Sequence, residues 1–316
     1  MTMKKIILSL LVLTTLGTIG CKKHETVPAP VPTTNLDSYF ENKETNAKQY
    51  FTVNSTASNS FTGNNGVVVG VPAHSFVYSN GDSVIGSVDF ELMEILDVSD
   101  MVSLKKTTRS DNEILVSGGQ IKLLASQNSS QVFLAPGKAL QISIPTTNPD
   151  PQMELFVGNE NASGDVNWLP SVVDTAQQDT LVIVTDTSSI GYYNFDFNTD
   201  SLGWINCDYF WNVSAPETTV AAHLPAEHDH TNTSCFLVFP NINSVISLYH
   251  NTGSSDGIFS TSYIPTGQTV IFVCISEIDG QFYSAFVNST IGVDHVENIN
   301  MTTTTEADLQ AAIDNL

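Results

Sequence analysis

Three histidines lie close together in the segment His223–His230, and Cys235 follows shortly after them. His228 and His230 are two residues apart, so on an extended segment their side chains project to the same side. Imidazole nitrogens and thiolates are ligands that Zn²⁺ prefers, and His223 or an acidic neighbour could complete the coordination shell. The spacing therefore predicts a metal site, of the kind that a metal carrier or a metal-dependent hydrolase would use.

A hydrolase at this segment would also need a general base and an open metal position. Glu227 could serve as the base, but nothing in the sequence singles it out. The alternative is a hydrophilic loop tip that is rich in ionisable residues and binds nothing. No catalytic residue is therefore assigned, and the sequence has no Gly-rich phosphate loop, nucleophile elbow or His-Glu-x-x-His motif.

Oxygen-rich segments offer a second cation hypothesis. Asn194–Asp200 alternates oxygen-bearing side chains along the chain, and the segments Asp97–Asp100 and Asp174–Asp179 are acidic. Carboxylate and carbonyl oxygens are the ligands of Ca²⁺, although Asn194–Asp200 lacks the glycine and the distal glutamate of an EF-hand loop. Calcium is therefore the alternative to zinc as a bound cation.

Aromatic residues form a third candidate site. All three tryptophans and several tyrosines lie in the second half of the chain, and for most of them we expect core packing. Tyr209, Phe210 and Trp211 are consecutive, and three consecutive side chains on a strand cannot all face inward. Tyr209 and Trp211 are therefore candidates for ligand-facing aromatics, which would favour binding of a carbohydrate or a protein.

The first residues of the chain predict export. Two lysines precede the apolar run Ile6–Leu16, which is too short for a membrane-spanning helix of about twenty residues. We therefore interpret residues 1–20 as a signal peptide. Its end, Gly20 followed by Cys21, resembles the lipobox of bacterial lipoproteins, in which signal peptidase II cuts before a cysteine that carries diacylglycerol. Thr18 departs from the leucine that this family prefers three places before the cysteine.

Residues 21–48 are expected to comprise the lipidated Cys21 and a linker. Proline recurs at every second position within Val27–Thr34, which keeps a chain extended and without internal hydrogen bonds. Such a spacer would hold a folded domain away from the bilayer. Lys22 stands where an aspartate acts as an inner-membrane retention signal in enteric bacteria. By that analogy the expected location is the outer membrane, on its periplasmic face or at the cell surface.

The charge of the chain excludes one class of partner. The formal net charge is −22 at pH 7, and Arg109 is the only arginine. Nucleic-acid binding requires clustered lysine and arginine that neutralise phosphates, so no nucleic-acid partner is expected. The expected partners are the membrane, through the lipid anchor, and a protein or a glycan of the cell envelope.

Short strands dominate the sequence pattern. Runs rich in valine, isoleucine, phenylalanine, tyrosine and threonine are bounded by glycine, asparagine, aspartate and proline, which predicts a mainly β protein built from β-sandwiches. The Asn-Gly pair at 80–81 and the Asp-Gly pair at 279–280 fit hairpin turns of type I′. Helices are expected only near Asp37–Tyr50, as one turn within Val98–Lys106, and after Thr305, which could act as an N-cap.

A domain break is expected in the turn-rich stretch Thr146–Gly158, which follows a complete set of strands. The prediction is therefore two tandem β-sandwich domains at 49–147 and 148–293. A tail at 294–316 with a short C-terminal helix would follow them.

Cysteine usage gives a disulfide prediction. If lipid occupies Cys21, three cysteines remain in an oxidising compartment. Cys274 lies in an apolar run and is expected to be a buried thiol, which leaves Cys207 and Cys235 to form a disulfide. Three buried thiols are the alternative. A nucleophilic role for Cys207 is disfavoured, because a reactive thiolate needs a base and a cationic environment and Asp208 has the opposite effect.

Residues 51–145 resemble a module of Bacteroidetes surface lipoproteins that is related to the ZU5-type β-sandwich. The resemblance rests on the segments Gly70–Phe76, Gly81–Val88, Glu91–Ile95, Ser99–Val102, Leu115–Gly119 and Leu134–Lys138. In the second predicted domain, the sequence Trp-Ile-Asn-Cys-Asp at Trp204–Asp208 resembles a recurrent motif of the same group. The resemblance implies a scaffold or interaction domain and no defined activity, since fold does not imply function.

Together these features predict a membrane-anchored extracytoplasmic lipoprotein that acts as a non-enzymatic scaffold or binding module. The alternative is a metal-dependent hydrolase, or a metal-binding lipoprotein, that uses the histidine cluster at 223–235.

Overall fold

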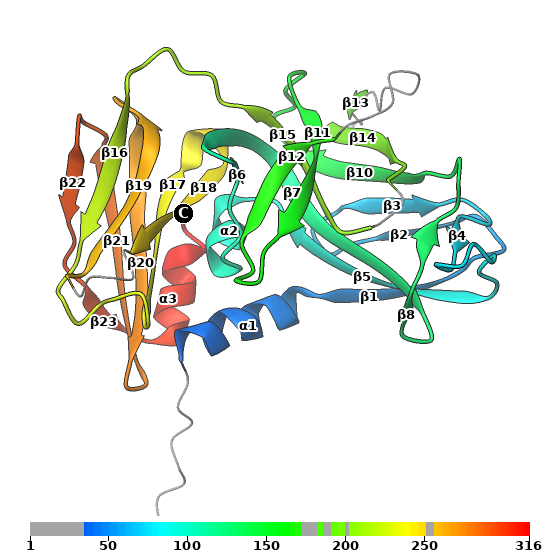
Figure 1. Ribbon diagram of the computed structural model, residues 1–316, viewed down its shortest axis with the longest axis horizontal. Coiled ribbons are helices and arrows are strands. Elements are labelled where there is room, and N and C mark those ends of the chain that lie inside the picture. The colour runs from blue at the N-terminus through cyan, green and yellow to red at the C-terminus, as the bar shows by residue number, and fades with distance from the viewer. Residues whose placement is uncertain (1–34, 172–181, 186–190, 200–201, 251–255) are drawn as a thin grey trace, which may run out of the picture. The chain divides into compact units, whose positions relative to one another are not determined.

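The computed structural model describes residues 35–171, 182–185, 191–199, 202–250 and 256–316 (Figure 1). The predicted signal peptide, Cys21 and the predicted linker up to Thr34 lie outside the described residues, as does the acidic segment Asp174–Asp179. The described part of the chain is mainly β, with its strands in several sheets and a short helix near its C-terminal end, which confirms the predicted fold class.

The first sheet is antiparallel and contains the longest strand, β7. Across the sheet the order of strands is β1 (Gln49–Asn54), β5 (Ser87–Ile95), β7 (Glu113–Gln127), β15 (Trp204–Phe210), β11 (Glu154–Glu160) and β12 (Val166–Pro170). Two short strands also pair with β7, namely β6 (Arg109–Ser110) and β8 (Ser130–Gln131).

A second sheet shares a core with the first. Its order is β13 (Val182–Thr185), β14 (Gly191–Phe197), β10 (Leu140–Thr146), β3 (Val68–Val71) and β2 (Asn59–Thr62), and a small separate pair is formed by β4 (Phe76–Val77) and β9 (Phe133–Leu134). Ile142 and Phe195 of the second sheet belong to the same apolar cluster as Phe90 and Ile205 of the first. Since side chains alternate along a strand, one face of each sheet supplies this core, as in a sandwich.

The third sheet is formed by the last third of the chain. Its order is β22 (His295–Asn298), β16 (Glu217–His223), β19 (Ile258–Pro265), β18 (Ser244–His250), β17 (Thr233–Phe239), β20 (Thr269–Ile278), β21 (Gln281–Thr290) and β23 (Thr302–Thr304). Only β16 and β22 pair in parallel among these described strands. Leu237, Ile246 and Phe272 lie in an apolar core on one face of this sheet.

Three helices pack between the first and third sheets: α1 (Leu36–Ala47), α2 (Val98–Ser103) and α3 (Glu306–Ile313) (Figure 1). The hydroxyl of Thr305 accepts a hydrogen bond from the Asp308 N–H at 3.1 Å, so the predicted N-cap of the last helix is present. Leu309 of α3 belongs to one apolar cluster with Trp168 of the first sheet and Val273 of the third. This shared cluster fixes the first sheet against the third.

The sheets do not divide where the sequence analysis placed its domain boundary, between 147 and 148. Strands β11, β12 and β15 complete the first sheet, and β14 pairs with β10 in the second. The change to the third sheet falls later, between β15 and β16, at residues 211–216. The turn residues of Thr146–Gly158 mark where the chain reverses, but they do not determine which strands pair across the sheet.

Candidate functional site

The connection between β15 and β16 crosses from the first sheet to the third, and one cavity lies beside it, while a second cavity is lined by Arg109. We call this region the seam; it comprises residues 107–114, 159–167, 211–217, 249 and 261–265. Thr108 ties the two sheets together here, because its N–H donates to the Val245 carbonyl at 2.9 Å and its hydroxyl lies 2.6 Å from that of Ser244.

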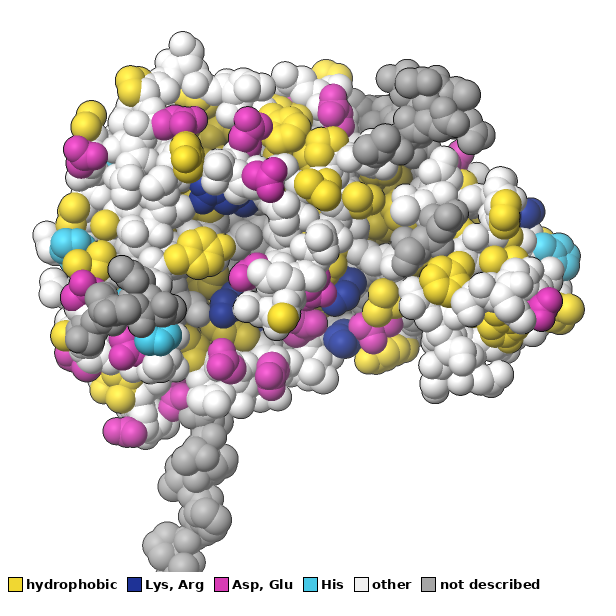
Figure 2. Space-filling model, in the orientation of Figure 1, with side chains coloured by type: hydrophobic (Ala, Val, Ile, Leu, Met, Phe, Trp, Pro, Cys, Tyr) yellow, Lys and Arg dark blue, Asp and Glu magenta, His cyan; other side chains and the backbone are white. Residues whose placement is uncertain are grey.

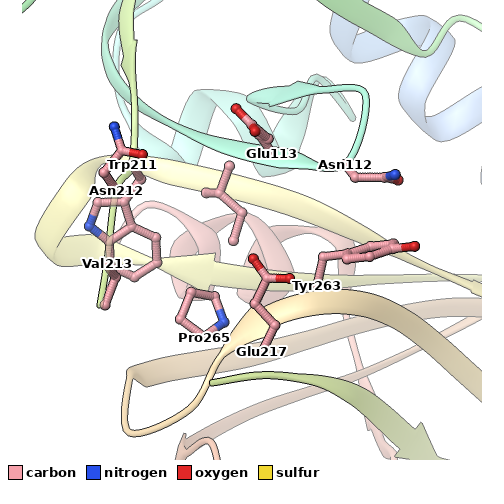
Figure 3. A pocket seen from close by; sticks show the side chains of 9 residues that line it. Asn112, Glu113, Trp211, Asn212, Val213, Glu217, Tyr263 and Pro265 are labelled. Atoms are coloured by element: carbon pink, nitrogen blue, oxygen red, sulfur yellow. The ribbon is translucent and has the colours of Figure 1, made fainter. Parts of the chain in front are cut away.

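The first cavity has a volume of about 110 Å³ and is shown in Figure 3. Its lining consists of Asn112, Glu113, Ile114, Trp211, Asn212, Val213, Glu217, Tyr263 and Pro265. In Figure 3 the rings of Trp211 and Tyr263 lie at opposite ends, with the carboxyl group of Glu217 between them. The Trp211 indole is held edge-on against Phe239, with ring centroids 5.5 Å apart, so it is a fixed aromatic wall.

A bulge in β19 places Tyr263 in this cavity. Thr218 pairs with Ile264 and Val220 pairs with Thr261, so β19 has one more residue than β16 between these pairs. Bulges of this kind re-aim side chains. Tyr263 has a φ of 65° and its side chain is half exposed. A non-glycine residue at positive φ costs about 1–3 kcal/mol and persists only where its surroundings hold it.

Arg109 holds the bulge from the side of the first sheet. Its Nη1 donates to the Thr261 hydroxyl at 2.7 Å, and its Nη2 donates to the carbonyls of Ser262 at 2.8 Å and Asn112 at 3.1 Å. Burial lowers the pKa of the guanidinium, an effect that the nearby oxygens of Tyr249, Glu217 and Tyr263 oppose. The arginine therefore holds the bulge beside the first cavity and lines the second, and its two Nη atoms are occupied by protein partners.

The second cavity lies on the other side of Arg109 and has a volume of about 420 Å³. Its lining consists of Thr107, Arg109, Asp111, Asn159, Asn161, Asp165, Val166, Asn167 and Tyr249. The Tyr249 side chain is 54% exposed. Burial of its hydroxyl and the nearby Asp165 charge raise the pKa of Tyr249. This lining combines one accessible ring with amides and carboxylates, which can donate and accept hydrogen bonds.

Asp111 and Asn167 fix the polar rim of the second cavity. The Asp111 N–H donates to Asn167 Oδ1 at 2.7 Å, and Asn167 Nδ2 donates to Asp111 Oδ1 at 3.1 Å. This reciprocal pair connects the turn before β7 with β12. The rim side chains are therefore pre-oriented, which reduces the entropy cost of binding a ligand.

The predicted zinc ligands do not come together. His228 is buried, with its Nδ1 2.9 Å from the Ser276 hydroxyl, and burial lowers its pKa. His230 is exposed and stacks on His250, with ring centroids 5.3 Å apart, while His223 ends strand β16. Within the described ranges no three His, Cys, Asp or Glu side chains form a group that could hold a metal ion.

Local hydrogen bonds explain why these histidines do not converge. The His228 N–H donates to the Pro225 carbonyl at 3.0 Å, and Asp229 Oδ1 accepts from the Thr231 N–H at 2.8 Å. The segment therefore runs through consecutive turns and is not extended, so the two-residue spacing does not place the imidazoles on one side. The acidic loop at Asp97 has a capping role, since Asp97 Oδ1 accepts from the Asp100 N–H at the start of α2.

The predicted disulfide between Cys207 and Cys235 is wrong for this structure, in which both are free and buried. Cys207 lies in the core that the first and second sheets share, whereas Cys235 lies in the core of the third sheet. The alternative of three buried thiols fits, because Cys274 is also free and buried. Burial raises the pKa of the Cys207 thiol, and Asp208 adds to this shift, so the thiol is not activated as a nucleophile.

The two predicted ligand-facing aromatics separate. Trp211 lines the first cavity, whereas Tyr209 packs against the core of the first and second sheets. Arg109, Tyr249 and Tyr263 were not predicted as site residues. Arg109 had one usable signal, since it is the only arginine in an acidic chain.

Fold and site together define a mainly β protein with a polar and aromatic seam between two sheets. No protein-family model matches the chain, and no curated protein is similar to it. Among solved structures, the Bacillus anthracis TIE protein matches 80% of this chain and 40% of its own chain, at 7% sequence identity and a TM-score of 0.17. This similarity is too low to transfer a fold or a function. Among the described residues, none of the helices is both long and apolar enough to cross a membrane.

Proposed function

We propose that this chain is an extracytoplasmic lipoprotein of the Bacteroidetes surface type, anchored to the outer membrane through Cys21, and that it acts as a non-enzymatic binding module with a ZU5-like sandwich. Support for the anchor is the lipobox-like sequence before Cys21 and the proline-rich spacer after it. Support for a binding role is the seam, where the half-buried Arg109 lines one cavity and holds the bulge that places Tyr263 in the other.

The ligand proposed for the seam is a neutral saccharide of the cell envelope or its surroundings. Saccharides present C–H faces that pack on aromatic rings and hydroxyls that bond to amides and carboxylates. Tyr249, Tyr263 and Trp211 supply the rings, and the cavity walls supply asparagine, aspartate and glutamate. The proposal of a saccharide depends on one observation, which is that the cavity linings combine aromatic rings with amide and carboxylate side chains.

The charge of the seam favours a neutral saccharide over an anionic one. Among the described lining residues Arg109 is the one cation, and its guanidinium already bonds to three protein oxygens. The chain has a net charge of −22, and acidic side chains are spread over the face seen in Figure 2. An anionic glycan would therefore meet repulsion without an available guanidinium fork.

A glycan panel tests the binding role. The full-length chain, purified in detergent, would be applied to immobilised neutral oligosaccharides (glucan, mannan, xylan and galactan fragments) and to anionic polyuronate fragments. We expect retention on at least one neutral saccharide and none on the polyuronates. Binding that is restricted to the polyuronates, or no binding to any panel member, would contradict the saccharide proposal.

The anchor is tested separately. Cells that express the natural chain or the Cys21→Ser variant would be labelled with a fatty acid and fractionated. We expect label and outer-membrane association for the natural chain, and loss of both for Cys21→Ser. An unlabelled natural chain, or a variant that stays in the membrane fraction without label, would overturn the lipid anchor while leaving the glycan result unaffected.

A further inference from the structure

Cys235 on β17 and Cys274 on β20 are direct partners in the antiparallel third sheet. The pairs on either side are Ser234 with Ile275 and Phe236 with Val273, so no bulge interrupts the register at the cysteines. Directly opposite residues of such strands have Cα atoms about 4.5 Å or 5.5 Å apart, depending on the hydrogen-bonding position. A disulfide requires a Cα separation of about 4.4–6.8 Å. The Cα atoms of Cys235 and Cys274 are therefore already at a separation that a disulfide can span.

The two side chains also point the same way. Both cysteines belong to the apolar core of the third sheet, together with Leu237 and Phe272, and both are buried. Burial raises the pKa of the Cys235 thiol, and the neighbouring Cys274 thiol adds to this shift, which agrees with two thiols that lie side by side. Joining them would need no change of strand register.

Cys207 cannot take part in this pair. It lies in the core of the first and second sheets, where Leu155 stands opposite it on β11. Its other neighbour is β7, where the register shifts between Asn206 and Asp208. The third sheet therefore holds one matched pair of thiols, and the first sheet holds one single thiol.

We infer that Cys235 and Cys274 become joined as an intrachain cross-strand disulfide in the exported protein. In this step the two thiols lose two protons and two electrons, and one S–S bond forms. The oxidant is the disulfide of an extracytoplasmic thiol–disulfide oxidoreductase, which is reduced to its dithiol by way of a mixed disulfide. The inference rests on the proposed export of the chain, because this exchange requires an oxidising compartment.

Burial determines when the bond can form. Both thiols are enclosed once β17 and β20 have paired, so an oxidoreductase can reach them only before the third sheet closes. The bond is therefore made during folding and afterwards protected from reductants in solution. It acts as a permanent link between β17 and β20 rather than as a redox switch.

Mass spectrometry of the natural chain gives the direct test. Protein isolated from the cell envelope without reductant would be denatured, alkylated with iodoacetamide and digested. The protease must cleave at acidic residues, because no lysine or arginine follows Lys138, and Asp256 separates the two cysteines. We expect one linked peptide pair containing Cys235 and Cys274, with Cys207 alkylated. Alkylation of both Cys235 and Cys274, or a link from either one to Cys207, would overturn the inference.

A second measurement follows stability. Reduction of the denatured chain before refolding should lower the thermal midpoint of the natural protein by several degrees, since the link restricts the unfolded chain. The double variant Cys235→Ala/Cys274→Ala should show one midpoint with or without reductant. Cys207→Ala is the matched control and should keep the reductant effect. Loss of the effect in Cys207→Ala would contradict the assignment. If the disulfide is found but Cys21 carries no fatty-acid label, the lipid anchor is refuted and the disulfide inference stands.

Discussion

The histidine segment at 223–235 and the seam both contain many side chains that can bind ligands, but these side chains are held differently. In the histidine segment, His228 bonds to Ser276 and His230 stacks on His250, so the imidazoles face different partners. In the seam, Arg109 and the bulge at Tyr263 direct rings and polar groups toward two cavities. Side chains that are close along the chain therefore need not converge in space.

The first and third sheets also differ in their positive charge. No lysine or arginine follows Lys138, so the third sheet has no such cation of its own. The positive charge that faces Glu217, Tyr249 and Tyr263 is supplied by Arg109 from the other side of the seam. One residue of the first sheet therefore supplies the positive charge beside the β19 bulge of the third sheet.

The largest effect is expected from Arg109→Ala. The change leaves two carbonyls and a hydroxyl without their charged donor, which should lower the free energy of unfolding by about 2–3 kcal/mol. Saccharide binding should fall at least about tenfold, because the second cavity loses a wall and the bulge that carries Tyr263 loses its support. Denaturant unfolding and calorimetric titration would measure the two effects.

Lys48→Ala is the matched control for Arg109→Ala. Lys48 forms a surface ion pair with Glu91 at 3.2 Å, and such a pair contributes about 1 kcal/mol or less. If Arg109→Ala were no more destabilising than Lys48→Ala, the seam would not depend on its arginine.

Tyr263→Gly should separate stability from binding. Glycine tolerates positive φ, so the change should relieve backbone strain and leave stability equal or higher by up to about 1 kcal/mol. Loss of the ring should still weaken saccharide binding. Asp279→Gly, at a φ of 52° in the β20–β21 hairpin, is the control that should relieve strain without affecting binding. A Tyr263→Gly protein with unchanged affinity would remove the first cavity from the binding site.

Several local features could be predicted from the sequence, because they depend on near neighbours. The cap at Thr305 and the positive φ angles of Asp279 and Gly280 follow from residue type alone. Trp211 was found by the argument that consecutive aromatics cannot all be buried. The pairing of Cys235 with Cys274 and the reach of Arg109 to Ser262 could not be predicted, because both depend on which distant strands become neighbours.

A moderate effect is expected for His228 at low pH. Burial lowers its pKa in the folded protein below that of the unfolded chain, so the folded state binds this proton less readily. The stability that the neutral His228 side chain allows is fully present above about pH 6.5, and it is lost as the pH falls below that value. His228→Gln should flatten this part of the stability curve in urea unfolding between pH 7 and pH 5. An unchanged curve would show that His228 is not the group responsible.

The smallest effect is expected from metal removal. Since the three histidines do not converge within the described chain, treatment with EDTA should leave the thermal midpoint unchanged, and titration with Zn²⁺ should show no stoichiometric site. A tight zinc site that disappears in His228→Gln would restore the histidine segment as a functional centre and reverse the comparison.

The saccharide proposal requires that the seam binds its ligand through aromatic residues. Its most direct test is calorimetric titration of the best-retained neutral oligosaccharide into the natural chain, Tyr249→Ala and Tyr50→Ala. Tyr50 is the matched control, because it is 70% exposed on β1 and lines a different cavity. We expect at least about a tenfold loss of affinity for Tyr249→Ala, worth about 1.4 kcal/mol, and no loss for Tyr50→Ala. Equal affinities for the natural chain and Tyr249→Ala, or a loss confined to Tyr50→Ala, would contradict the saccharide proposal.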